Sequence, residues 1–151
     1  MNRCELANAY HDKGFNCAQA VLASFGDLTH LPEQEALSVS GGFGGGVGGT
    51  HEEICGALSG AVMVLSLLYP HIQEYDAEGK RRIYGIIQEL RKRFQEKFSE
   101  TCCKDLLRAK IEVDDRVPAA KALGITGHCA VLIVSAVELV EEMLREAGVS
   151  C

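Results

Sequence analysis

Cysteines are the residues of this chain most able to do chemistry. Seven occur among its 151 residues, which is a high number for a domain of this size. No basic segment followed by an apolar core and a small-residue cleavage site opens the chain. We therefore expect a cytoplasmic protein whose cysteines are thiols, metal ligands or redox groups rather than structural disulfides. The seven are Cys4, Cys17, Cys55, Cys102, Cys103, Cys129 and Cys151.

Four of these cysteines lie in or near the first turn of a predicted helix. Helix N-termini carry unpaired N–H groups and partial positive charge, which lower the pKa of a thiol. If the four helices begin at the same end of a bundle, their thiolates meet there. The predicted catalytic residues and the predicted metal ligands are therefore the same set, Cys17, Cys55, Cys103 and Cys129.

Scattered single thiolates suit two kinds of redox site equally well. One is an iron–sulfur cluster or another thiolate-bound metal, and the other is a dithiol/disulfide pair with Cys55 as the attacking thiolate. A structural zinc site is less favoured because no Cys-x-x-Cys pair occurs. Cys102 and Cys103 compete for one place, since a disulfide between neighbours is strained. A soft-metal carrier or sensor, or a helical interaction module, is the alternative from a different class.

A glycine run at residues 41–49 leads towards Cys55. Glycine loses much backbone entropy on folding, so a dense run is costly. Its presence indicates a place where the backbone must lie close to another part of the molecule. Its match to a dinucleotide fingerprint carries little weight without a surrounding βαβ unit. We predict that the loop borders the site, and that His51 is a ligand, a base for Cys55 or part of a proton relay; a solvated loop-to-helix junction is the simpler alternative. The predicted cofactor-binding residues are Gly44, Gly45, Gly46 and His51.

Helical periodicity predicts an all-α fold, a single multi-helix bundle over residues 1–151. Asn16 with Gln19 forms a capping-box pattern, and Asp76 and Thr101 are further predicted N-caps. The segment 112–128 is rich in turn residues. The expected helices cover residues 3–13, 17–25, 32–40, 53–69, 76–98, a short segment from 102, and 128–147.

Residues 54–73 contain no Asp, Glu, Lys or Arg. A membrane span needs about 20 apolar residues, and Pro70 ends the apolar helix too early. We therefore expect the buried central helix of a bundle. Its face of small residues permits a close helix crossing within the chain or between two chains. That face comprises Gly56, Ser59, Gly60 and Ala61.

The net charge of −6 speaks against a nucleic-acid partner, which would require a basic face. The expected partners are an unidentified redox protein, a membrane protein with which the chain associates, and a second copy in a homodimer.

Several motifs taken together resemble the C_GCAxxG_C_C family of redox-active proteins over roughly residues 12–145. They are Asn16-Cys17-Ala18-Gln19, Gly42-Phe43-Gly44-Gly45-Gly46, Cys55-Gly56-Ala57-Leu58-Ser59-Gly60, Cys103-Lys104-Asp105-Leu106 and Cys129. The resemblance implies redox chemistry at the four cysteines, and it prefers Cys103 over Cys102. A helical region of some multihaem cytochromes is similar and holds an iron–sulfur centre. The link over residues 48–53 departs from the family, where a shorter turn containing arginine is expected.

Overall fold

Nine α-helices and one short 3-10 helix make up the structure, a computed structural model that describes residues 1–151. The all-α prediction is confirmed, because no strand occurs beyond one isolated bridge between Ile54 and Cys102. The elements are α1 (Arg3–Asp12), α2 (Cys17–Ala23), α3 (Gly26–Thr29), α4 (Glu33–Ser40), η1 (Gly41–Phe43), α5 (Gly56–Leu68), α6 (Ala77–Phe98), α7 (Cys103–Arg108), α8 (Pro118–Leu123) and α9 (His128–Glu146).

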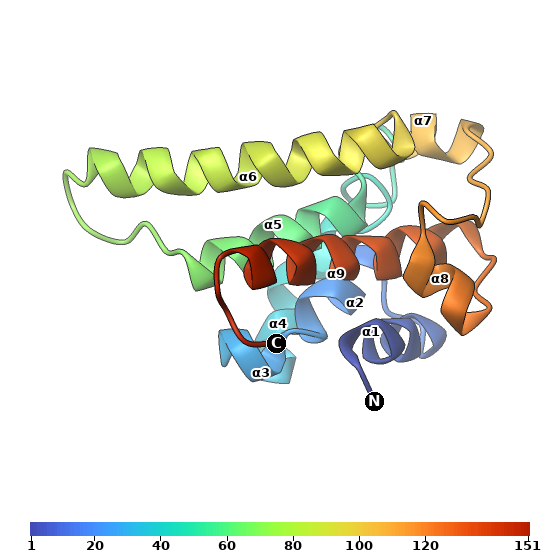
Figure 1. The fold of residues 1–151 in the computed structure, drawn as a ribbon, viewed down its shortest axis with the longest axis horizontal. Coiled ribbons are helices and arrows are strands. Elements are labelled where there is room, and N and C mark those ends of the chain that lie inside the picture. Colours follow the sequence, from blue (N-terminus) through green and yellow to red (C-terminus); the bar gives the residue numbers. More distant parts are fainter.

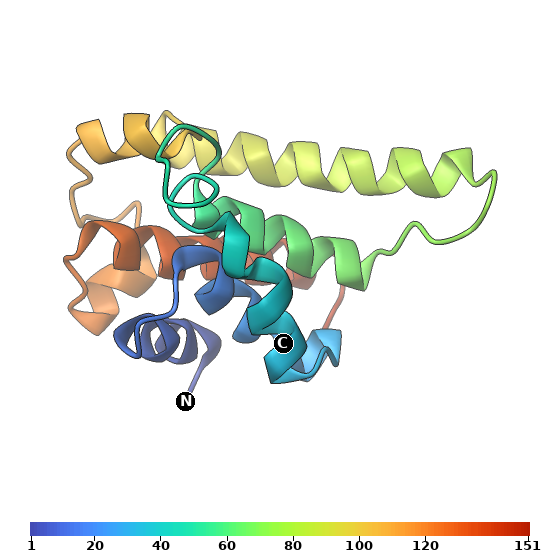
Figure 2. The ribbon, with the colours of Figure 1, turned by 180° about the vertical axis from the view of Figure 1, so that it is seen from behind.

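The helices form layers around α5 and α9. Helices α6 and α7 run along one side, α5 and α9 lie beneath them, and α1 to α4 cover the opposite side (Figure 1). Helix α8 packs against α9. The view from behind shows the loop between η1 and α5 beside α7, at the end of the bundle where α5 begins (Figure 2).

Side-chain caps start several helices, and those at Asn16 and Asp76 are where the sequence predicts them. Asn2 and Asn16 each accept a hydrogen bond from a backbone N–H three residues on. The side chains of Glu5 and Gln19 in turn accept hydrogen bonds from the backbone N–H groups of Asn2 and Asn16, which completes two capping boxes. Asp76 accepts the N–H of Gly79 at the start of α6. Each such cap is worth about 1 kcal/mol.

Helix α5 is buried between α2, α6 and α9. Its small-residue face packs on α2: a Cβ built on Gly60 would lie 2.8 Å from the carbonyl oxygen of Ala18 and 2.9 Å from Cβ of Val21. The close crossing is thus made within one chain, and this face is not free for a second copy. A homodimer stays a prediction that needs another surface. The largest fully buried side chains of the core include Leu22, Phe25, Leu58, Leu65, Leu90, Phe94, Leu106, Leu132 and Ile133.

Some element boundaries differ from the prediction. Helix α2 ends at Ala23, and α3 lies between the two helices predicted over residues 17–25 and 32–40. Helix α8 lies inside the predicted turn region, where Pro118 occupies its first turn and Gly124 ends it at a φ of 67°. Cys102, rather than Thr101, is the N-cap of α7 and makes no side-chain cap. The carbonyl of Thr101 instead accepts the N–H of Cys55, at 2.8 Å.

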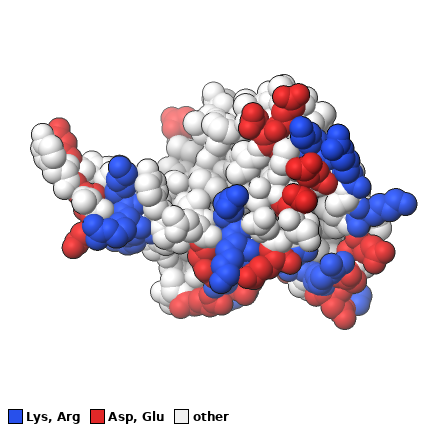
Figure 3. Space-filling model, turned by 90° about the horizontal axis from the view of Figure 1, so that it is seen from above, with Lys and Arg blue, Asp and Glu red and all other residues white.

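The outer face of α6 is charged with both signs intermingled. Seen from above, acidic and basic side chains alternate over this face without a continuous basic area (Figure 3). The loop before α6 and its first turns extend beyond α5 (Figure 1), and Ile72 and Tyr75 in that loop are exposed. No helix combines the length and the apolar character needed to cross a bilayer.

Candidate functional site

The glycine loop is held by its own backbone hydrogen bonds. The N–H of Gly48 donates to the carbonyl of Gly42 at 2.8 Å, and the N–H of Gly49 donates to Gly44 at 3.1 Å. The Thr50 hydroxyl donates to two further loop carbonyls. Gly45, Gly46, Gly48 and Gly49 all have positive φ, a conformation that glycine adopts without steric penalty. The run is therefore a defined turn structure that this composition permits.

The end of the loop pairs with the segment that leads into α7. The N–H of Cys55 donates to Thr101, and the N–H of Cys103 donates to the carbonyl of Glu53, both at 2.8 Å. The N–H of Lys104 donates to the carbonyl of His51, also at 2.8 Å. This short backbone pairing brings Cys55 and Cys103 to one place, although they are far apart in sequence.

Four thiols gather at this end of the bundle, close enough to influence one another's ionisation. Burial raises the pKa of Cys103, and the thiolates of Cys129 and Cys102 raise it further. Cys55 is affected in the same way by Cys103 and Cys129, and the pKa of Cys17 is raised by Cys129, by burial and by Cys55. The beginnings of α2, α5, α7 and α9 therefore supply one cluster of thiols.

Cys17 and Cys129 affect each other's ionisation more than the other members of this cluster do. The neighbouring Cys17 thiol stabilises the Cys129 thiolate and lowers the pKa of Cys129 to about 7, against the effect of burial. The same interaction, with burial, raises the pKa of Cys17. The pair consequently holds one proton on Cys17 and presents a thiolate on Cys129 near neutral pH.

Cys55, which the sequence suggested as the attacking thiolate, lies in different surroundings. Its side chain is 3% exposed, and burial raises its pKa to about 11. The N–H groups of Ala57 and Leu58 at the start of α5 act in the opposite direction but do not overcome burial. The expectation that helix N-termini lower the thiol pKa at all four cysteines is therefore wrong, because burial outweighs the helix terminus.

His51 contacts Cys103 rather than Cys55. Its Nδ1 atom lies 3.3 Å from Sγ of Cys103, within hydrogen-bonding distance for sulfur. The imidazole is exposed, and the Cys103 side chain is half-buried. The neighbouring Cys102 thiol points elsewhere and donates to the carbonyl of Glu52 at 3.4 Å. Of the two adjacent cysteines, Cys103 is therefore the one beside a base.

The three glycines predicted to bind a cofactor are packed against the protein itself. A Cβ on Gly44 would lie 2.2 Å from Cγ of Asn16, and one on Gly45 would lie 2.9 Å from Cα of Gly49. A Cβ on Gly46 would lie 2.7 Å from Cβ of Cys103. The close approach predicted for the loop is thus made with α2 and α7, and a cofactor role for these glycines stays a prediction.

The four thiols were also predicted to bind an iron–sulfur cluster or another metal. Thiolates are the ligands that such soft metals prefer. No three His, Cys, Asp or Glu side chains are placed so that they could share an ion, however. The donor chemistry suits a soft metal, but the arrangement of the side chains does not form its coordination sphere. The metal assignment therefore remains a prediction.

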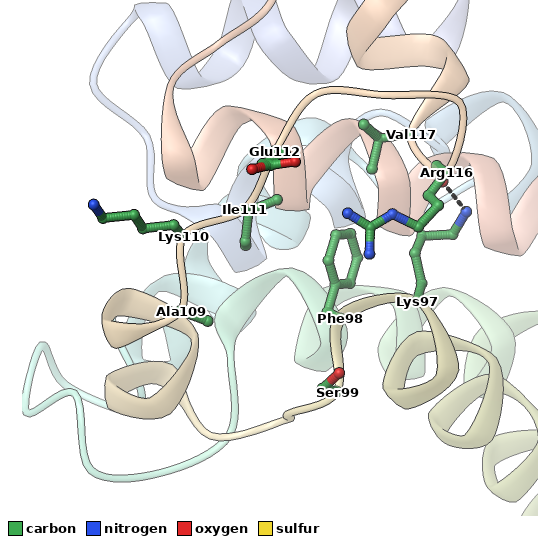
Figure 4. Close-up of a pocket in the computed structure, with 9 residues that line it drawn as sticks. All are labelled: Lys97, Phe98, Ser99, Ala109, Lys110, Ile111, Glu112, Arg116 and Val117. Atoms are coloured by element: carbon green, nitrogen blue, oxygen red, sulfur yellow. Dashed lines mark hydrogen bonds between the residues drawn. The ribbon is translucent and has the colours of Figure 1, made fainter.

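The remaining cysteines lie outside the cluster. Cys4 is buried, and its thiol donates to the carbonyl of Val134 at 3.6 Å; burial raises its pKa to about 12. Cys151 is exposed at the C-terminus. A pocket of about 160 Å³ lies between the end of α6 and the segment after α7, and no cysteine lines it (Figure 4). Lys97 there donates to the carbonyl of Arg116.

Comparison with protein families assigns the chain. The model of the family described as "Putative redox-active protein (C_GCAxxG_C_C)" matches residues 15–143. The chain belongs to the C_GCAxxG_C_C family. The matched range contains all four clustered cysteines, so this C_GCAxxG_C_C protein carries its thiol cluster within the family domain. Comparison with curated proteins and with solved structures gave no significant match.

Two parts of the site were missed by sequence reasoning. Asn16 was recognised only as a cap, yet its Nδ2 also donates to the carbonyl of Gly41 at 2.9 Å and ties α2 to the loop. The contact between His51 and Cys103 was not foreseen. It depends on backbone pairing across about 50 residues, for which the side-chain pattern carries no signal.

Proposed function

We propose that this protein carries two electrons as a reversible disulfide between Cys17 and Cys129. The observation that supports it is the mutual effect of these two thiols, in the first turns of α2 and α9: Cys17 lowers the pKa of Cys129, and Cys129 raises the pKa of Cys17. Membership of a redox-active family agrees with this chemistry. The proposal needs no ligand geometry beyond the two sulfur atoms.

The environment of each thiol suits a dithiol/disulfide couple. A thiolate is the attacking species in disulfide exchange, and an attacking thiol works best when its pKa is close to the ambient pH. The pKa of Cys129, about 7, meets this condition. Cys17 supplies the second sulfur and loses its proton when it attacks the mixed disulfide on Cys129. Oxidation of the pair releases two electrons, and reduction restores both thiols.

Thiol titration and peptide mapping test the proposal. The reduced protein is incubated with glutathione disulfide and free thiols are then blocked. We expect the count of free thiols to fall by two, and mapping to identify the Cys17–Cys129 bond. Cys102→Ser is the matched control and should lose the same two thiols. Iron and sulfide in stoichiometric amounts after anaerobic purification, with no mapped Cys17–Cys129 bond, would overturn the proposal.

A further inference from the structure

The contact between His51 and Cys103 forms a second reactive centre beside the Cys17–Cys129 pair. Nδ1 of His51 lies 3.3 Å from Sγ of Cys103, so the imidazole can take the thiol proton directly. No other cysteine in the chain has an imidazole nitrogen within hydrogen-bonding distance. Burial and the neighbouring thiolates raise the pKa of Cys103, so this thiol needs a base to take its proton during attack, and His51 is placed to do so.

The backbone of His51 is held in an uncommon conformation. Its φ is 63°, in the left-handed region that few non-glycine residues adopt. Two hydrogen bonds of 2.8 Å maintain it, one from the His51 N–H to Gly45 and one from the Lys104 N–H to the His51 carbonyl. Such conformations persist where the surrounding structure imposes them, often at functional sites. Here the imposed geometry directs the imidazole to Cys103.

Gly46 provides the space in which the two residues meet. A Cβ at this position would lie 2.7 Å from Cβ of Cys103 and 2.8 Å from Cα of His51. Any larger residue would have to push them apart. The N–H of Cys103 is fixed at the same time by the carbonyl of Glu53. The glycine loop therefore acts as a template for this centre.

The burial of the four clustered thiols decreases stepwise towards the surface. Cys55 is the most enclosed, Cys17 and Cys129 follow, and Cys103 is the least enclosed. Cys103 and Cys129 are also close enough for the Cys129 thiolate to act on Cys103. A large molecule approaching from solvent can thus reach Cys103 more readily than the inner pair, Cys17 and Cys129. Of these two, Cys129 is the less enclosed.

We propose that Cys103, with His51 as its base, is the thiol through which the protein exchanges electrons with disulfides from solution. The passage of electrons between Cys103 and the inner pair rests on the function proposed above. The role of Cys103 as the point of attack stands on the geometry of His51, Gly46 and Cys103 alone.

The sequence of exchange steps balances atoms and electrons. The Cys103 proton moves to Nδ1 of His51, and the thiolate attacks one sulfur of the substrate disulfide. The other substrate sulfur leaves and takes the proton from His51. The Cys129 thiolate then attacks Sγ of Cys103 and releases the second substrate thiolate, which is protonated by solvent. Cys17 gives its proton to solvent and attacks Cys129, and Cys103 leaves as a thiolate that takes up a proton from solvent. The substrate disulfide is thereby reduced to two thiols and the Cys17–Cys129 pair is oxidised.

The test traps the first step in a variant that lacks the next sulfur. Reduced Cys129→Ser protein is mixed with glutathione disulfide at neutral pH, quenched with acid and mapped by mass spectrometry. Cys151 serves as an exposed thiol without a base in the same molecule. We expect glutathione to add to Cys103 about 100-fold faster than to Cys151, and His51→Gln to remove that advantage. Equal rates at the two cysteines, or no effect of His51→Gln, would overturn the proposal.

Controls separate loss of fold from loss of chemistry. Cys102→Ser removes the adjacent thiol, which contacts a backbone carbonyl and no imidazole; because His51 is retained, Cys103 should remain much faster than Cys151 in this variant. Circular dichroism checks that His51→Gln, an exposed position, retains the helical fold. Insulin in place of glutathione disulfide determines the source of the disulfide. A complex trapped on Cys103 supports a protein substrate, whereas adducts with glutathione alone support a small one.

The two proposals fail in different ways. Rapid addition to Cys103 without any Cys17–Cys129 bond in the wild-type protein would overturn the proposed function and support Cys103 as the point of attack. A Cys17–Cys129 bond that forms with glutathione disulfide at an unchanged rate in Cys103→Ser would overturn the role of Cys103 and support the function.

Discussion

Oxidation of the Cys17–Cys129 pair should raise the thermal stability of the protein by a measurable amount. A bond between these positions closes a loop of about 110 residues. The chain-entropy estimate for a loop of this length is about 5 kcal/mol, and measured disulfides typically contribute about 2–4 kcal/mol. For a domain of this size each kcal/mol shifts Tm by roughly 2–4 °C. We therefore expect Tm to rise by roughly 4–16 °C on oxidation.

The assay compares reduced and oxidised protein by circular dichroism during heating. Cys17→Ser and Cys129→Ser cannot form the bond and should show no difference between the two conditions. Cys102→Ser retains both sulfurs of the pair and should show the full wild-type increase. A reductant added to the oxidised wild-type protein should return Tm to its original value, because the bond is reversible.

Two results would refute this reasoning. If the oxidised and reduced wild-type proteins have the same Tm while mapping shows the bond, the disulfide strains the native fold by as much as it constrains the unfolded chain. If the increase persists in Cys129→Ser, another pair of cysteines forms the bond. Cys55 with Cys103 would then be the pair to test, since their segments are joined by backbone hydrogen bonds.

Two further predictions concern the thiolate and the loop. Iodoacetamide should modify Cys129 at a rate that rises with pH around a midpoint near 7, because the thiolate forms above the pKa of the thiol. Cys17→Ala should move that midpoint above about 8. Isotope-coded alkylation measures both midpoints. Gly46→Ala should destabilise the protein by about 2–4 kcal/mol in urea unfolding, since a positive φ and crowding against Cys103 act together.

A contradicting outcome or a matched control exists for both predictions, the one on Cys129 and the one on Gly46. An unchanged midpoint in Cys17→Ala would show that the Cys17 thiol does not stabilise the Cys129 thiolate. Gly48 has a φ of 65°, close to the 68° of Gly46, but a Cβ there would meet nothing within 4 Å. Gly48→Ala should therefore lose only the conformational part, about 1 kcal/mol. Equal losses at Gly46 and Gly48 would mean that crowding at Cys103 has no energetic consequence.

Local sequence patterns predicted most of the helices because their determinants are local. Apolar periodicity and the caps at Asn16 and Asp76 act within one or two turns, and the structure confirms both caps. The sequence also contained a signal for α8 that was not used, with Pro118 in its first turn and Gly124 just after its end. The prediction for that segment failed because its turn residues were given more weight than these two signals.

The chemistry of the thiols was harder to predict because it depends on burial and on distant neighbours. The position of Cys55 at the start of a helix is visible in the sequence, but its burial is not, and burial decides the direction of its pKa shift. Cys129 gains its low pKa from a residue more than 100 positions away. The helix-start pattern therefore located the thiols without ranking their reactivity.

The glycine run connects three of the four segments that carry the clustered thiols. It joins α2 through Asn16, which bonds to the carbonyl of Gly41 and packs on Gly44. It joins α5 where a Cβ on Gly56 would lie 3.1 Å from both Cα of Gly44 and Cβ of Cys17, and it joins α7 where Gly46 meets Cys103. A side chain at Gly46 would overlap Cys103, and one at Gly56 would crowd Cys17. These two glycines therefore help to set the spacing of the thiols on which the proposed electron exchange depends.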